Sequence, residues 1–119
     1  MAVSDAELDL PARIKRVLLE SRYPLSYGAL ARCLDVPGPG AIAKIAQALE
    51  SLMRDDQADG RPFVAALCEG RLSGGLPALG FFQMAAALGR YCGPATGPEA
   101  AAFVSDQRRL LGWPKPFTN

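Results

Sequence analysis

Histidine is absent from this 119-residue sequence, and cysteine occurs only three times. Without histidine, the chain lacks the commonest general base and the commonest protein ligand for zinc. Cys33, Cys68 and Cys92 show no Cys-x-x-Cys spacing, so we expect no disulfide framework. These absences favour a reducing, cytoplasmic location and argue against catalysis that needs histidine.

Long apolar runs and an excess of one charge are missing as well. No stretch approaches the roughly 18 to 20 apolar residues that a membrane helix needs. Asp5, Glu7 and Asp9 stand where a signal peptide has its cationic region, so we expect neither a signal peptide nor membrane contact. The 13 Lys and Arg residues nearly balance the 12 Asp and Glu residues, which leaves a net charge of +1. Any binding to DNA must therefore depend on local clusters of cations.

The residues that are present indicate one globular domain spanning residues 1–119. Half of them are hydrophobic and 21% are charged, which is enough for a single core. The chain is organised around residues 24–52, which read as a short helix, a Gly/Pro turn and a longer helix. Ser26 can cap the short helix, at about residues 27–34, and the prolines and glycines of residues 35–40 prevent a continuous helix. This order is the pattern of a helix-turn-helix.

The longer helix, at about residues 40–55, has two faces. The apolar positions that recur at helical spacing are expected in the core: Ile42, Ile45, Ala46, Leu49, Leu52 and Met53. The opposite face carries hydrogen-bond donors and no acid before Asp55: Lys44, Gln47, Ser51 and Arg54. Such a face could lie in the major groove of DNA, and it is equally consistent with an ordinary polar helix surface.

The segment after this helix predicts a small β-hairpin that would serve as a wing. Residues 62–68 form a short apolar run of strand length, and residues 72–77 could form the return strand with a glycine-rich tip. Arg71 would be the only charged contact of this wing. Further helices are expected at about residues 9–21, 80–90 and 96–111.

The expected fold class is mainly α with a small β-hairpin, in a single winged helix-turn-helix-like domain. Its core covers residues 9–91, and an extra C-terminal helix and tail cover residues 96–119. Trp113 and Phe117 of the tail either pack against the body of the domain or are exposed for a partner.

Enzymatic activity is not expected. The carboxylates are scattered along the chain, and the glycine-rich residues 70–75 lack the Gly-Lys-Ser/Thr ending of a phosphate-binding loop. A nucleophilic Cys68 would need positive charge nearby, and Arg71 is the only close candidate in the sequence. We therefore expect no catalytic residue, no cofactor and no metal.

Residues 26–31 read Ser-Tyr-Gly-Ala-Leu-Ala, and residues 43–49 read Ala-Lys-Ile-Ala-Gln-Ala-Leu after the Gly/Pro turn. This order resembles the DNA-binding domain of the alkylguanine-DNA alkyltransferases and the alkyltransferase-like proteins. Their Tyr-Gly-x-(Ile/Leu)-Ala helix precedes an Ala-Arg-Ala-Val-Gly-x-Ala-Leu recognition helix. The resemblance covers about residues 10–91 and implies a winged helix-turn-helix. It matches Tyr27 to a tyrosine that contacts the target phosphate, and Lys44 to an arginine that fills the gap left by a flipped base. Tyr27 is equally consistent with an aromatic residue in the core or at a helix cap.

The departures from this family concern its chemistry. Phe63 stands where the family has its alkyl-accepting cysteine, and Val64 and Ala65 replace its histidine and arginine. The resemblance therefore implies no alkyl transfer. Lys44 lacks the planar fork of arginine, which argues against recognition of damage by base flipping.

Taken together, these patterns predict a non-enzymatic protein that binds double-stranded DNA, either a regulator or an alkyltransferase-like module. The predicted DNA contacts are Tyr27, Lys44, Gln47, Ser51, Arg54 and Arg71. The alternative is a protein–protein adaptor that kept the fold and lost DNA binding, and the near-neutral charge favours it. The C-terminal helix is a candidate contact for a homodimer.

Overall fold

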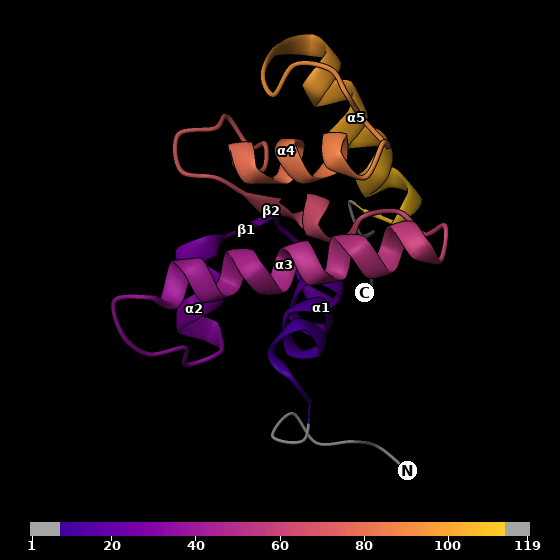
Figure 1. Ribbon diagram of the computed structural model, residues 1–119. Coiled ribbons are helices and arrows are strands. Elements are labelled where there is room, and N and C mark those ends of the chain that lie inside the picture. Colours follow the sequence, from indigo (N-terminus) through magenta and orange to yellow (C-terminus); the bar gives the residue numbers. More distant parts are fainter. Residues whose placement is uncertain (1–7, 114–119) are drawn as a thin grey trace, which may run out of the picture.

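The computed structural model describes residues 8–113, and five α-helices dominate this part of the chain (Figure 1). The helices are α1 (Leu10–Glu20), α2 (Tyr27–Cys33), α3 (Ala41–Ala58), α4 (Leu79–Ala87) and α5 (Gly97–Leu110). The other elements are a 3-10 helix, η2 (Val64–Leu67), and two strands, β1 (Leu25–Ser26) and β2 (Cys68–Glu69). The long helix α3 crosses the middle of the molecule, with α1 and α2 on one side and α4 and α5 on the other (Figure 1).

Side-chain caps set the starts of the first two helices. The N–H of Ala12 donates to Oδ1 of Asp9 at 3.0 Å, and the N–H of Ala29 donates to Oγ of Ser26 at 3.0 Å. Each cap satisfies an N–H that the start of a helix leaves without a partner. The helices predicted for residues 9–21 and 27–34 are confirmed, because α1 and α2 match both ranges closely.

One apolar core joins these helices. Ile14 and Leu18 of α1, Leu30 of α2 and Ile45 of α3 are all fully buried. Burial of a side chain of this size stabilises the fold by about 1.5 to 3 kcal/mol. The core therefore fixes α2 and α3 relative to each other, so that the outer face of α3 is carried on a rigid support.

The predicted β-hairpin is wrong in its first strand. Residues 64–67 form η2 instead of a strand, and β2 pairs in parallel with β1, with Leu25 opposite Cys68. Every side chain from Phe63 to Cys68 is buried. A hairpin strand with one solvated face would turn alternate side chains to water, whereas a buried 3-10 turn can place four consecutive apolar residues in the core.

The return strand predicted for residues 72–77 is absent too. Leu72, Gly74 and Gly75 have φ values of 58°, 60° and 86°, which an extended strand does not allow. This segment is a loop instead, so the structure contains no antiparallel wing within residues 8–113.

The long helix begins at Ala41, close to its predicted start, and extends past its predicted end at about residue 55 to Ala58. Asp56, in this added turn, is only 2% exposed. Ile42 was expected in the core and is 48% exposed. Cys33 of α2, which lies on the apolar stripe of its helix in the sequence, is exposed as well.

The last two helices follow the predicted order, with α4 and α5 close to the expected ranges. Ala100 and Val104 of α5 are buried in the common core, so α5 is an integral part of the domain. Trp113 is half-buried, and the guanidinium carbon of Arg108 lies 5.6 Å from the centre of its ring. Phe117 lies outside the described residues.

Candidate functional site

Four of the six predicted DNA contacts lie on one face of α3, and we name them the donor row: Lys44, Gln47, Ser51 and Arg54. Three of the side chains are exposed, and that of Ser51 is half-buried. Within residues 8–113, none of the four donates a side-chain hydrogen bond or forms an ion pair. Their hydrogen-bonding capacity is therefore available to a ligand.

Acidic side chains limit the positive charge of the donor row. Asp55 follows Lys44 by eleven residues, which is about three helical turns, so both project from the same side of α3. Glu50 is half-buried on the neighbouring side of the helix. The positive charge of the row is thus confined to Lys44 and Arg54.

Tyr27 does not join the donor row, because its side chain points into the molecule. Its hydroxyl oxygen accepts a hydrogen bond from the N–H of Ala78 at 3.3 Å. Burial, together with the nearby Cys68, raises the pKa of Tyr27 to about 12, and the hydrogen bond from Ala78 partly opposes this. Tyr27 therefore links the start of α2 to the segment before α4.

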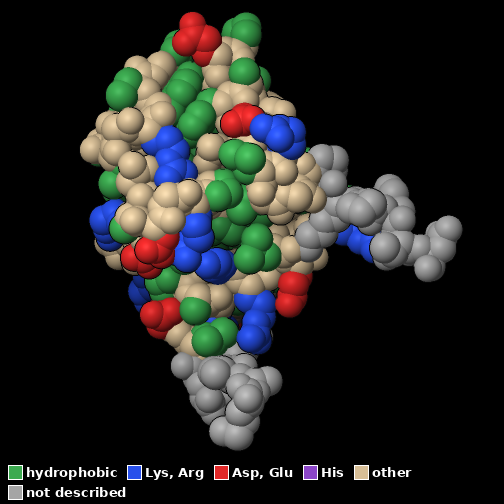
Figure 2. All heavy atoms as spheres, turned by 90° about the vertical axis from the view of Figure 1, so that its right-hand side faces the viewer, with side chains coloured by type: hydrophobic (Ala, Val, Ile, Leu, Met, Phe, Trp, Pro, Cys, Tyr) green, Lys and Arg blue, Asp and Glu red, His purple; other side chains and the backbone are tan. Residues whose placement is uncertain are grey.

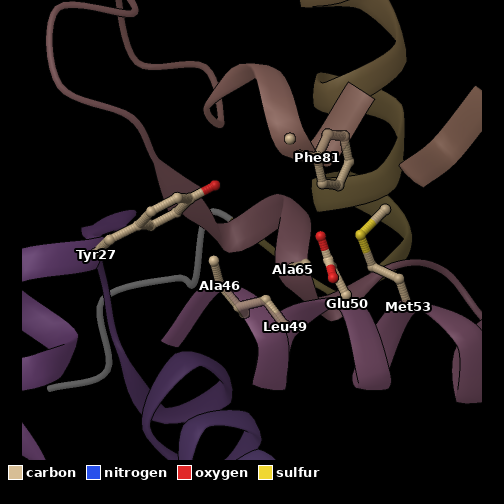
Figure 3. A pocket seen from close by; sticks show the side chains of 8 residues that line it. Tyr27, Ala46, Leu49, Glu50, Met53, Ala65 and Phe81 are labelled. Atoms are coloured by element: carbon tan, nitrogen blue, oxygen red, sulfur yellow. The ribbon is translucent and has the colours of Figure 1, made fainter. Parts of the chain in front are cut away.

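Tyr27 also borders a small cavity of about 40 Å³ between α3 and α4 (Figure 3). Its lining is mostly apolar: Tyr27, Ala46, Leu49, Glu50, Met53, Ala65, Gly80 and Phe81. A cavity that holds benzene needs about 150 Å³, so a nucleobase does not fit here. Phe63, at the place of the alkyl-accepting cysteine in the resemblance, is fully buried and does not line the cavity.

Arg71 is exposed and lies on the loop formed by residues 70–77. The N–H of Gly70 donates to the carbonyl of Leu76 at 2.8 Å and closes the base of this loop. A β-carbon on Gly70 would come within 2.7 Å of Oγ of Ser73 and 2.9 Å of Cα of Ala78, so a larger residue would open the base. Arg71 is therefore carried on a compact loop and not on the predicted wing.

Sequence reasoning missed a buried polar set that holds η2 in place. Oδ2 of Asp56 accepts from the N–H of Val64 at 3.0 Å, and Oε1 of Gln107 accepts from the N–H of Phe63 at 2.8 Å. Asp56 could have been found from its spacing, because it continues the apolar stripe of α3 one turn after Leu52. No comparable signal marked Gln107, since it depends on how α5 packs.

Arg108 completes this set. Its Nε donates to the carbonyl of Ala66 at 2.7 Å, and its Nη2 donates to those of Cys68 and Gly75 at 3.2 and 2.8 Å. Burial lowers the pKa of Arg108, while Glu69 and Cys68 oppose the shift. Burial also raises the pKa of the Cys68 thiol, and Arg108 offsets only part of this. A protonated, buried thiol is a poor nucleophile.

A concave surface surrounds Ile42 at the start of α3, and we name it the Ile42 groove. It consists of a hollow of about 580 Å³ and an adjoining shallow, open part of the surface, both lined by Gly28, Arg32 and Ile42. The hollow extends to Glu69, Gly70, Arg71 and Leu72, and the shallow part extends to Asp35, Val36 and Pro37. Ile42 and Lys44 are about 200° apart around α3, so the groove and the donor row are different surfaces.

The side of the molecule that carries α5 presents charges of both signs. On the side that carries α5 and the C-terminal end of α3, cationic and acidic side chains alternate around a band of apolar ones (Figure 2). Residues 8–113 contain no group of three or more Cys, Asp or Glu side chains that could hold a metal ion. No helix in the same range is long and apolar enough to cross a membrane.

No protein-family model matches the chain. Neither the curated proteins nor the solved structures contain a match. The resemblance of residues 10–91 to the alkyltransferases therefore stays a prediction from the sequence.

Proposed function

We propose that the protein is a non-enzymatic DNA-binding protein that contacts double-stranded DNA through the donor row on α3. The donor row carries this proposal. Lys44, Gln47 and Arg54 project from an exposed helix face without partners in the described chain. Lys and Arg bind phosphates, while Gln and Arg can also reach base edges in the major groove.

The arrangement around α3 supports contact with a duplex. The start of the helix presents the exposed Ala43 and follows the exposed residues Gly38, Pro39 and Gly40, which allow close approach to a backbone. Arg71 lies on a separate loop beside the Ile42 groove. With so few cations, we expect modest affinity and a shallow salt dependence, because each phosphate contact contributes about 0.9 to the slope of log K against log salt.

Fluorescence-anisotropy titration of a labelled random duplex tests this proposal. We expect binding at low salt that weakens as salt rises. Lys44→Ala should lower affinity and reduce the salt slope by about 1. Lys15→Ala, on α1, removes the same charge away from the donor row and should bind like the wild type. If the wild type does not bind at low salt, or if both variants behave alike, the donor row is not a DNA-binding surface.

The second candidate function is the protein–protein adaptor, and the Ile42 groove favours it. Ile42 and Leu72 are 48% and 98% exposed, and both line this groove. Exposed apolar side chains beside arginine are typical of protein interfaces. Pull-down with the wild type and with Leu72→Glu would identify a partner that depends on this groove, and no loss of that partner in the variant would contradict the adaptor.

A further inference from the structure

An open cleft of about 420 Å³ lies between the 70–77 loop and α5, and we name it the Trp113 cleft. Its lining comes from the loop, from α5 and from the turn that follows α5: Gly74, Gly75, Leu76, Ala101, Val104, Ser105, Arg108, Arg109 and Trp113. Two of these side chains are cationic and none is acidic. The lining therefore carries charge of one sign, unlike that of the Ile42 groove.

Arg108 is half-buried in the wall of this cleft and lacks a paired anion. Its Nε and Nη2 donate to three neutral carbonyls, while Nη1 donates no hydrogen bond within residues 8–113. No carboxylate of this part of the chain forms an ion pair with it. Glu69 is near enough to oppose the lowering of the Arg108 pKa by burial, but it lines the Ile42 groove and not the cleft. A partly desolvated cation in this state favours an anion from outside.

Trp113 supplies a second donor without a partner. Its indole Nε1 is shielded from water and makes no hydrogen bond in the described chain. Buried donors are nearly always paired in native structures, so an unpaired one indicates a partner outside the described chain. The guanidinium carbon of Arg108 lies 5.6 Å from the centre of the indole ring, which places both donors in the same part of the cleft.

Apolar side chains complete the lining and define the rest of the ligand, since Leu76, Val104 and the ring of Trp113 lie beside the two donors. We propose that the Trp113 cleft binds a small organic acid, whose carboxylate accepts from Nη1 of Arg108 and Nε1 of Trp113 and whose apolar body contacts Leu76. A carboxylate can accept both bonds, and the bond from a guanidinium is among the strong ones. The cleft is separate from the donor row on α3, so this inference does not depend on DNA binding.

The fluorescence of Trp113 tests the inference, because it is the only tryptophan of the chain. Titration of the full chain with cyclohexanecarboxylate is expected to change this fluorescence to saturation. Cyclohexanecarboxamide has the same apolar body without the charge and should bind about tenfold more weakly or worse. Inorganic phosphate has the charge without the apolar body and should also bind more weakly than the acid. Equal binding of the acid and either of these compounds would overturn the ligand class, and no saturable change up to about 10 mM would overturn the site.

Ala101 and Ala102 provide matched variants, since both are exposed on α5 and only Ala101 lines the cleft. Ala101→Glu should weaken the binding of cyclohexanecarboxylate by about tenfold or more, because like charges repel in the cleft. Ala101→Gln has a similar shape without the charge and should weaken binding less.

Ala102→Glu adds the same charge outside the cleft, where salt screens it, and should bind within about threefold of the wild type. Circular dichroism of each variant checks that the fold is retained. If Ala101→Glu and Ala102→Glu bind the acid alike, or if Ala101→Gln weakens binding as much as Ala101→Glu, the inference is wrong. Each of these results leaves the test of the donor row with DNA unaffected.

Discussion

A carboxylate near the C-terminal end of a helix opposes the helix dipole. Asp56 lies in the last turn of α3 and is nevertheless 2% exposed. Two hydrogen bonds offset this cost, from the N–H of Val64 to Oδ2 and from Nε of Arg61 to Oδ1 at 3.2 Å. At the scale of single residues, Asp56 thus connects the helix that carries the donor row to the buried segment behind it.

Replacement of Asp56 by alanine is expected to destabilise the protein by about 2 to 4 kcal/mol, because the buried N–H of Val64 loses its acceptor and Arg61 loses one of its two carboxylate partners and keeps only Asp59 among the described residues. Urea unfolding should show a lower midpoint with an unchanged m-value. Asp55→Ala, at the exposed neighbouring position, should change the free energy of unfolding by less than about 0.5 kcal/mol. Equal shifts in the two variants would show that Asp56 contributes only its charge.

At the scale of elements, α5 acts as a clamp through Arg108. One guanidinium holds carbonyls from η2, β2 and the 70–77 loop. Arg108→Ala should therefore increase hydrogen exchange at the amide of Gly70, whose bond closes the loop, more than at amides in the middle of α3. Arg109→Ala is the control, because Arg109 is exposed and, within residues 8–113, pairs only with Asp106. A uniform increase along the chain after Arg108→Ala would mean general destabilisation instead of release of the loop.

The helices could be predicted from the sequence because their signals are local. Asp9 and Ser26 cap the helices that follow them, and apolar spacing marks the buried side of α3. The hairpin could not be predicted correctly, since residues 64–67 are fully buried by packing against α3 and α5, and β2 pairs with a strand some 40 residues earlier. Such pairing depends on tertiary contacts that local spacing does not contain.

The candidate surfaces show the same contrast between features set by local sequence and features set by tertiary packing. The donor row followed from helical spacing alone, and the structure places its four residues on one face of α3. Tyr27 was a predicted DNA contact, with a core or cap role left open, and it points inward, where its hydroxyl oxygen accepts a hydrogen bond from the N–H of Ala78. The Ile42 groove was missed because the exposure of Ile42 and Leu72 is decided by elements that are distant in sequence.

The stability of the whole molecule should depend on alkaline pH through Tyr27. The unfolded chain releases the phenol proton near a pH of about 10, whereas burial keeps the folded pKa at about 12. The folded state therefore binds the proton more tightly, and the free energy of unfolding falls as pH rises between these values. The buried thiol of Cys68, whose pKa is also raised, adds to the fall.

Tyr27→Phe should make this fall shallower, as measured by thermal unfolding from pH ~9 to pH ~11. At neutral pH it should cost about 1 kcal/mol, because the N–H of Ala78 loses its acceptor. Tyr23→Phe is the control, since Tyr23 is 72% exposed. A pH dependence as steep in Tyr27→Phe as in the wild type would contradict the assignment.

The clamp by α5 also sets an order of events during synthesis. Residues 63–68 leave the ribosome about 40 residues ahead of Gln107 and Arg108, which supply their backbone partners. At typical synthesis rates of about 5 to 20 residues per second, this apolar segment remains without Gln107 and Arg108 for some seconds. The nascent chain thus passes through a period in which the backbone N–H and carbonyl groups of residues 63–68 lack these partners, and the synthesis of α5 ends that period.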